Sequence, residues 1–304
     1  MDAELSQRLA RLLDHVDHWL PPAPTPVEWN THVAAIWQRH PLGGRLVPVP
    51  PRDTMTLDDL LGIERQKLAL VDNTRAFLQG LPANHALLWG SRGSGKSSVI
   101  RALLNSLATE GLRLIQVDRH DLSSLPLLVE QLRDQPHRFV VYCDDLSFEG
   151  NDDAYKALKS VLDGALTGPP DNVLLYATSN RRHLLPESMD DNSGSRLVGE
   201  ELHHGDAVEE KISLSDRFGL WLGFHPFSQA TYLEVCEHWV SRIGGQQEWD
   251  EAARAEAVRF ATLRGGRSGR TAWQFAAHDL GRKPRHERGG DRAWPDLAVG
   301  AERP

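Results

Sequence analysis

Short apolar runs bounded by turn residues alternate with amphipathic stretches between residue 53 and about residue 227. Apolar residues at nearly every position of a short run are typical of strands that are buried on both faces of a sheet. The expected strands are residues 86–89, 112–117, 139–143 and 173–177, and the expected helices are residues 96–107, 126–132 and 152–166. This alternation predicts an α/β domain in which helices flank a parallel sheet.

The first 52 residues follow helical periodicity instead. Leucine and valine recur at helical spacing from Leu5 to Leu20, and the prolines that begin at Pro21 prevent this helix from continuing. A second helix is expected from four apolar residues that fall on one helical face: Trp29, Val33, Ile36 and Trp37. Residues 1–52 are therefore predicted to form an N-terminal helical extension.

The C-terminal part of the chain also shows helical spacing and contains no expected strand. Residues 228–243, 249–263 and 270–280 predict three helices, so residues 228–281 are expected to form a small α-helical domain. Residues 282–304 are rich in glycine, proline and charge, which predicts a mobile tail.

Composition narrows the class of protein further. The 304 residues include only two cysteines, Cys143 and Cys236, which excludes a disulfide framework and fits a reducing compartment. The formal net charge of −8 disfavours a protein that coats nucleic acid with its whole surface. The first residues lack the apolar core of a signal peptide, and no run reaches the ~18 apolar residues of a membrane span. A cytoplasmic protein without a membrane partner is expected.

The sequence GSRGSGKS at residues 90–97 matches the phosphate-binding loop pattern G-x-x-x-x-G-K-[ST]. It follows an expected strand and precedes an expected helix, which is the arrangement that the chemistry needs. Its backbone amides and the helix N-terminus attract phosphate, Lys96 reaches the β and γ phosphates, and the Ser97 hydroxyl is a ligand for Mg²⁺. The candidate nucleotide-binding residues of this loop are Gly90, Ser91, Arg92, Gly93, Ser94, Gly95, Lys96, Ser97 and Ser98.

A second buried strand ends in two carboxylates, as in a Walker B motif. The run FVVYCDD occupies residues 139–145. Asp144 is expected to hold Mg²⁺, mostly through water, and Asp145 is expected to orient or deprotonate the attacking water. Cys143 lies inside the apolar run and is expected to be a small buried hydrophobic residue.

These two motifs leave open a nucleoside triphosphatase and a phosphotransferase that acts on a small metabolite. The later motifs and their order resemble those of AAA+ ATPases. The strand that ends at Asn180 resembles the sensor 1 position, and residues 213–219 resemble the segment that carries the arginine finger, here Arg217. Residues 264–272 resemble the sensor 2 region, in which Arg270 is the first candidate and Arg267 the second.

Residues 57–280 as a whole resemble an AAA+ module on the initiator and helicase-loader side of that superfamily. The phrases LLGIE (60–64), WGSRG (89–93) and NRRHL (180–184) are similar to a group of bacterial AAA+ ATPases filed as a domain of unknown function. The resemblance implies an α/β P-loop fold with a parallel sheet and a C-terminal helical lid. It also implies hydrolysis of ATP to ADP with Mg²⁺, but it does not indicate a physiological role.

The resemblance further implies a homo-oligomer, as a ring or an open ring. In the AAA+ layout Arg217 faces the nucleotide of a neighbouring subunit, and Asn180 polarises the attacking water. A guanidinium group suits this role because its fork of donors matches the charge that spreads over the phosphoryl oxygens. Asp145 stands where many AAA+ motors have glutamate, which predicts either a backbone that brings the shorter side chain closer or slow hydrolysis typical of a switch.

The sequence points to a macromolecular partner without identifying it. Residues 118–124 contain no aromatic residue, which disfavours an unfoldase that threads its substrate. Residues 186–211 carry eight acidic residues against Arg196 and Lys211, which makes this insertion a candidate docking site for a basic partner or for a neighbouring subunit. Residues 264–288 carry seven lysines or arginines against Asp279 and Glu287, so a nucleic-acid partner stays open.

Overall fold

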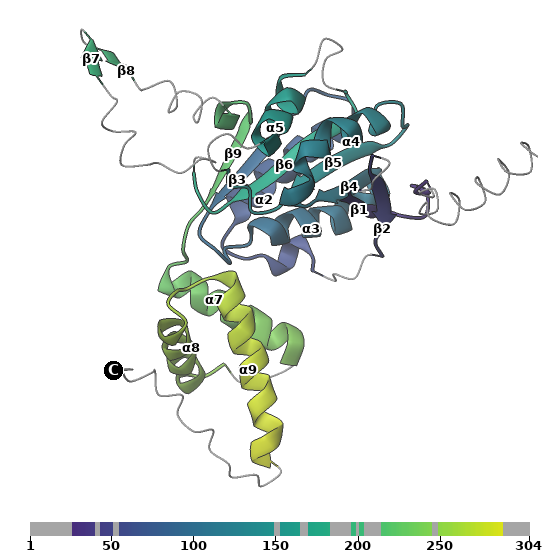
Figure 1. Cartoon of the computed structure of the whole chain (residues 1–304). Coiled ribbons are helices and arrows are strands. Elements are labelled where there is room, and N and C mark those ends of the chain that lie inside the picture. Colours follow the sequence, from purple (N-terminus) through teal and green to yellow (C-terminus); the bar gives the residue numbers. More distant parts are fainter. Residues whose placement is uncertain are drawn as a thin grey trace, which may run out of the picture.

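A seven-stranded sheet forms the centre of the molecule (Figure 1). The computed structural model describes residues 26–39, 43–50, 55–148, 153–164, 170–182, 196–198, 201–203, 214–244 and 249–287. The strand order is β2-β1-β4-β5-β6-β3-β9, and every neighbouring pair is parallel except β1 and β2. The strands are β1 (Ala34–Gln38), β2 (Arg45–Pro48), β3 (Ala86–Gly90), β4 (Leu112–Val117), β5 (Arg138–Cys143), β6 (Val173–Ser179) and β9 (Leu220–Phe224).

Helices cover both faces of this sheet, as the continuous apolar runs predict. On β5, Phe139 and Val141 point into one core and Val140 and Tyr142 point into the other. The first core is closed by α4 (Leu125–Leu132) and α5 (Asp153–Asp163), and the second by α2 (Glu64–Leu78) and α3 (Lys96–Leu107). The short 3-10 segments are η1 (Leu57–Asp59), η2 (Ala108–Glu110) and η3 (Arg119–Ser124).

The four strands and three helices expected for this domain are confirmed, and their ends differ from the expected ones by at most three residues. The sequence did not predict helix α2 or strand β9. The helix α2 lies ahead of the phosphate loop, and β9 pairs with β3 to complete the sheet on that side.

The helix expected from Trp29, Val33, Ile36 and Trp37 is wrong. Residues 34–38 form β1 and residues 45–48 form β2, so the sheet begins before residue 53. The backbone of β1 satisfies its polar groups by pairing with β4, and Trp37 is completely buried with its indole Nε1 donating to Ser124 Oγ at 2.8 Å. A strand lets Trp37 and Ala35 fill one core while Ile36 points to the opposite face. The helix expected between Leu5 and Leu20 lies outside the described residues.

The three helices expected in the C-terminal part of the chain are present, and they pack together as a small domain (Figure 1). They are α7 (Gln229–Gly244), α8 (Glu251–Leu263) and α9 (Gly269–Glu287). The helices share a core of their own, in which Tyr232, Trp239 and Phe275 are the largest buried side chains. We call this domain the lid. The predicted tail keeps helical structure to Glu287, and residues 288–304 lie outside the described part of the chain.

The acidic insertion, residues 186–211, is described only in two short strands. Strands β7 (Arg196–Val198) and β8 (Glu201–His203) pair with each other in an antiparallel sheet. The remaining residues of this insertion, and with them the predicted docking role, lie outside the described residues.

Within the described part of the chain, no helix combines the length and the apolar character that crossing a bilayer requires.

Candidate functional site

The loop between β3 and α3 has the backbone that a phosphate cradle needs. Gly90, Gly93 and Gly95 have φ values of +131°, +76° and +104°, which L side chains rarely adopt. A Cβ atom at Gly90 would also lie only 1.9 Å from the carbonyl oxygen of Phe224. The positive potential of the α3 N-terminus points toward this loop, and the first turn of α3 carries no acidic residue of its own.

Lys96 is held inside this loop. Its side-chain Nζ donates to the carbonyl oxygens of Gly90 and Ser91, each at 2.8 Å, and to Asn180 Oδ1 at 3.2 Å. Only 7% of Lys96 is exposed. Asn180 follows the last residue of β6, so the sheet places it beside the loop although it lies 84 residues along the chain.

Several charged groups share the space around Lys96. Burial lowers the pKa of the Lys96 ammonium, while the carboxylates of Asp145 and Asp144 oppose this shift. The guanidinium groups of Arg270 and Arg92 lower the same pKa further. The cations and carboxylates therefore interact electrostatically at one place, and the cations give it the positive charge that a polyphosphate requires.

Asp144 lies against two hydroxyl groups. Ser97 Oγ donates to Asp144 Oδ1 at 2.8 Å, and Thr178 Oγ1 donates to the same oxygen at 2.6 Å. Burial by itself would raise the pKa of Asp144, but the hydrogen bonds from Thr178 and Ser97 hold this pKa below its usual value. An ionised carboxylate beside a hydroxyl offers the hard oxygen ligands that Mg²⁺ takes, so Asp144 and Ser97 fit a magnesium ion.

Asp145 adopts a left-handed backbone with φ of +52°, and it is the one non-glycine residue with positive φ in the described part of the chain. Its backbone N–H donates to Thr178 Oγ1 at 2.9 Å, and one carboxylate oxygen accepts from Asn180 Nδ2. Aspartate tolerates this conformation better than most residues do. The backbone thus supplies a reason for the short side chain at this position.

These groups line one cavity of about 520 Å³, a size typical of ligand sites. Its polar side is formed by residues 92–98, Asp144, Asp145, Thr178, Asn180 and Arg270. Its apolar side combines the segment before α2 with the lid, and the residues there are Met55, Leu60, Leu61, Ile63, Phe227, Val235, Trp239 and Trp273. The α/β domain that contains the seven-stranded sheet, which we call the body, and the lid therefore build the cavity together.

The structure separates the two sensor 2 candidates. Arg270 lines the cavity, and its backbone N–H donates to the Gly93 carbonyl at 3.1 Å. Arg267 is not among the described residues that line this cavity, and its guanidinium donates to Gln229 Oε1 at 3.1 Å. Gly93 is suited to this junction because a Cβ atom would lie 3.0 Å from that of Arg270.

Arg217 lies away from the cavity of its own chain. It comes directly after a short helical segment at residues 214–216. It forms an ion pair with Asp163 at the end of α5, and it is not among the described residues that line the cavity. The hydrogen bond to Asp163 raises the pKa of Arg217, which keeps the side chain cationic. Cys143, in contrast, is fully buried as expected, and burial raises the pKa of its thiol to about 12.

Sequence reasoning missed Thr178 and the apolar side of the cavity. Thr178 could have been noticed as a polar residue near the end of a strand that is otherwise apolar. The apolar side gives no local signal because the segment before α2 and the lid are distant in sequence. Asp59, which also lines the cavity, was missed for the same reason.

Comparisons with known proteins agree with this architecture. The model of a family described as "Protein of unknown function (DUF815)" matches residues 30–283. The structure is similar to that of the Thermotoga maritima RuvB Holliday junction branch migration motor, with a TM-score of 0.51 and 17% identity over 81% of this chain and 70% of RuvB. It is also similar to the Aeropyrum pernix ORC1 protein in complex with DNA, with a TM-score of 0.51 and 16% identity over 77% of this chain and 63% of ORC1. A search of curated proteins found no match.

These similarities confirm the predicted fold class. The chain has the α/β P-loop fold of AAA+ proteins, with a mostly parallel sheet between helical layers and a small helical domain after it.

Proposed function

The chain belongs to the DUF815 family of proteins of unknown function, and since that membership assigns no activity, we propose from the cavity itself that the protein is an Mg²⁺-dependent ATPase. One observation carries the proposal: the phosphate loop, a cation and the two carboxylates that follow β5 meet in one cavity. Hydrolysis in this proposal drives remodelling or switching of a macromolecular partner, and it takes place between subunits of a homo-oligomer.

The polar side of the cavity would bind the triphosphate. Amides of the loop from Gly90 to Ser98 surround the phosphates, Lys96 pairs with the β and γ phosphates, and Arg270 approaches from the lid. The apolar side would receive the base, because a purine ring can stack on aromatic side chains and pack against aliphatic ones. Ser97 and Asp144 would hold Mg²⁺, which neutralises charge on the transferred phosphoryl group.

Asp145 and Asn180 would act on the attacking water. The Asp145 carboxylate orients the water or accepts its proton, and the hydrogen bond from Asn180 fixes that carboxylate. Asn180 also contacts Lys96, so the side chain that binds phosphate and the side chain that orients water are joined through one amide. This connection lets the water respond to an occupied phosphate site.

Arg217 would serve the nucleotide of a neighbouring subunit. The support is its place outside the cavity of its own chain together with its permanent charge. An arginine supplied from a second subunit is worth ~10³ to 10⁵ in rate in related phosphoryl-transfer reactions. Assembly would therefore control turnover.

The proposal is tested by nucleotide binding and by phosphate release from ATP. Lys96→Ala should abolish binding, because the cation at the β and γ phosphates is lost. Asp145→Asn should keep binding and lose turnover. Asp153→Asn is a matched control, since it removes the charge of a carboxylate that is 85% exposed and lies outside the cavity.

Two results would contradict the proposal. Wild-type ATP affinity in Lys96→Ala would show that the loop does not bind the phosphates, and a wild-type rate in Asp145→Asn would assign the water to another residue. Transfer of phosphate to a small acceptor in place of water would favour the phosphotransferase. A pull-down with Asp145→Asn held in ATP should enrich the macromolecular partner, because that complex is trapped.

A DNA-associated loader or initiator is the second candidate function. The basic composition of residues 264–288 and the similarity to a structure of ORC1 with DNA favour it. Three of these basic residues are already engaged within the protein itself. Arg264 lies over the Phe260 ring, Arg267 donates a hydrogen bond to Gln229, and Arg270 lines the cavity. Stimulation of ATP hydrolysis by DNA, weakening steeply with salt, would support this candidate.

A further inference from the structure

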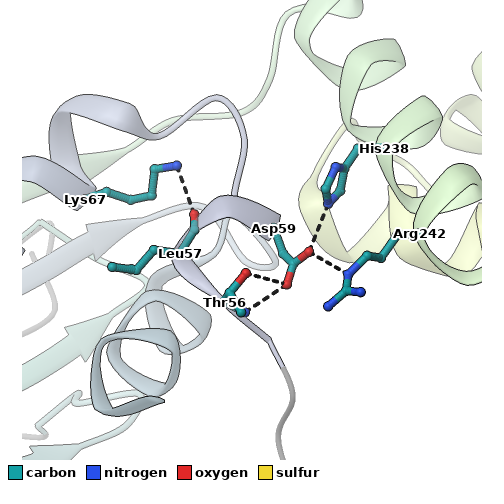
Figure 2. A network of polar contacts seen from close by, with 6 residues as sticks. All are labelled: Thr56, Leu57, Asp59, Lys67, His238 and Arg242. Atoms are coloured by element: carbon teal, nitrogen blue, oxygen red, sulfur yellow. Dashed lines mark hydrogen bonds and ion pairs between the residues drawn. The ribbon is translucent and has the colours of Figure 1, made fainter. Parts of the chain in front are cut away.

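A buried carboxylate connects the body to the lid beside the nucleotide cavity. Asp59 ends the 3-10 segment η1, is 4% exposed, and uses both of its side-chain oxygens (Figure 2). Oδ2 accepts from the backbone N–H of Thr56 at 2.8 Å and from the Thr56 hydroxyl at 2.9 Å. Oδ1 accepts from Arg242 Nε at 3.0 Å and lies 3.2 Å from His238 Nε2.

The body side of this connection is fixed by two helices. Lys67 of α2 donates from Nζ to the carbonyl oxygen of Leu57 at 3.0 Å, as Figure 2 shows. Asn105 of α3 donates from Nδ2 to the carbonyl oxygen of Met55 at 2.9 Å. The segment that carries Asp59 is therefore anchored to the two helices that follow and precede the phosphate loop.

The lid side of the connection is one face of α7. His238 and Arg242 are four residues apart, which places them one above the other on that helix. Between them, Trp239 faces both the cavity and the lid core, where it meets the same cluster as Phe275 of α9. Arg270 is the second residue of α9, and α9 shares the lid core with α7, so a fixed α7 also fixes the position of Arg270.

Charge makes this contact costly to break. Burial by itself would raise the pKa of Asp59, but hydrogen bonds from Thr56, Arg242 and His238 hold that pKa below its usual value. A carboxylate that stays ionised while buried needs its partners, and two of them belong to the lid. The contact therefore favours the arrangement of body and lid in which the cavity is complete.

We propose that Asp59, His238 and Arg242 form a clasp that positions the lid over the nucleotide, with Asp59 acting as a positioning residue for Arg270. The inference rests on the proposed function, because it gives Arg270 a phosphate to contact. Asp59 lines the part of the cavity proposed for the base, and Arg270 of the lid lines the part proposed for the phosphates. The clasp would therefore hold together the two surfaces that bind the two halves of the nucleotide.

The test uses Arg242→Met on the full chain. Arg242 is 49% exposed on its side chain and is outside the described cavity lining, so this variant keeps the cavity and most of the packing. Arg254→Met on α8 is the matched control, since it removes an exposed arginine from the same lid. Asp59→Ala is the second variant, and its folding is checked by circular dichroism.

Two measurements report whether the clasp holds the lid in place: a distance between body and lid, and the affinities for ATP and ADP. Spin labels at Ser160→Cys in α5 and Ala255→Cys in α8 report the distance between body and lid, because the native Cys143 and Cys236 are buried. Binding of ATP and ADP reports the contribution of Arg270 to the γ phosphate. We expect a broader distance distribution in Arg242→Met and about a tenfold loss in the ratio of ATP to ADP affinity, corresponding to one charged hydrogen bond.

A double-mutant cycle separates positioning from general stability. In the Arg270→Ala background, Arg242→Met should leave the ATP-to-ADP ratio unchanged, because the residue that the clasp positions is gone. A narrow wild-type distance distribution in both Arg242→Met and Asp59→Ala would overturn the clasp. So would equal losses from Arg242→Met with and without Arg270. Failure of the wild-type chain to bind ATP would refute the proposed function, whereas the distance measurement would still decide whether the clasp exists.

Discussion

Replacing Thr178 with valine tests whether one hydroxyl holds the two carboxylates after β5 in position. Valine keeps the branched shape of threonine and removes the hydroxyl. In the wild type, that hydroxyl donates to Asp144 at 2.6 Å and accepts from the backbone of Asp145 at 2.9 Å. Both contacts disappear in Thr178→Val, and the left-handed turn at Asp145 loses the side chain that secures it.

The magnitude follows from these two contacts. A hydrogen bond to a charged group contributes about 1.5–3 kcal/mol, and a neutral one contributes about 0.5–1.5 kcal/mol. Both aspartates are exposed on one side, so water restores part of each contact. We therefore expect a loss of about 2 kcal/mol in the positioning of the carboxylates, which corresponds to about a 30-fold change in an equilibrium constant.

The assay is the Mg²⁺ dependence of ATP hydrolysis, with binding of ATP in EDTA as a second measurement. Thr178→Val should need about 30-fold more Mg²⁺ for half of its maximal rate. Binding without Mg²⁺ should stay close to wild type, because the phosphate loop is intact. Thr178→Ser keeps the hydroxyl and should restore the Mg²⁺ dependence.

The same substitution predicts a shift with pH. The hydrogen bond from Thr178 helps to hold the pKa of Asp144 below its usual value against burial, which would raise it. Thr178→Val should therefore raise the pKa of Asp144, and the acid limb of the rate profile should move to higher pH. In the wild type, the lowered pKa stabilises the fold above the ordinary aspartate pKa, and this stabilisation is lost as pH falls through the folded value. Wild-type Mg²⁺ dependence and an unmoved acid limb in the valine variant would refute this reasoning.

Three further substitutions probe the surroundings of the cavity. Arg217→Ala should bind ATP and lose hydrolysis, and mixing it with Asp145→Asn should restore part of the rate through mixed interfaces; no recovery in demonstrably mixed oligomers would argue against action in trans. Arg270→Ala should weaken ATP binding about tenfold relative to ADP, whereas Arg267→Ala should change neither affinity, and titration calorimetry of both variants distinguishes them. Gly93→Ala should destabilise the fold by about 1–2 kcal/mol, because φ is +76° and the new Cβ meets the start of α9; a melting temperature equal to wild type would contradict that estimate.

The central strands could be predicted because each is a largely apolar run that is bounded by turn residues. β1 could not, since its spacing of apolar residues also fits a helix, and only the neighbouring edge of β4 decides between the two. β9 is a short run interrupted by Gly223, and α2 mixes charged and apolar residues without a strong stripe. In each case, the deciding contact comes from a distant part of the chain.

The candidate site divides in the same way. The phosphate loop and the two aspartates are local motifs, so the sequence predicts their chemistry and their order. Thr178 and Asp59 act through contacts that span more than thirty residues, and one of them crosses from the body to the lid. No local pattern marks such residues, because their meaning depends on the fold.

Asn180 connects the lysine of the phosphate loop to the carboxylate of Asp145, and this connection would allow the cavity to act as a switch. Its amide oxygen accepts from Lys96 at 3.2 Å and its amide nitrogen donates to Asp145. A carboxylate at this position could accept from the lysine but, when ionised, could not donate to the aspartate, so the amide makes a connection that a carboxylate could not. If a phosphate binds Lys96 as we propose, it would compete with Asn180 for the ammonium group, and the amide would then be free to reposition Asp145 and its water. Hydrolysis would then depend on how fully the phosphate site is occupied, which is the behaviour expected of a protein that signals its nucleotide state.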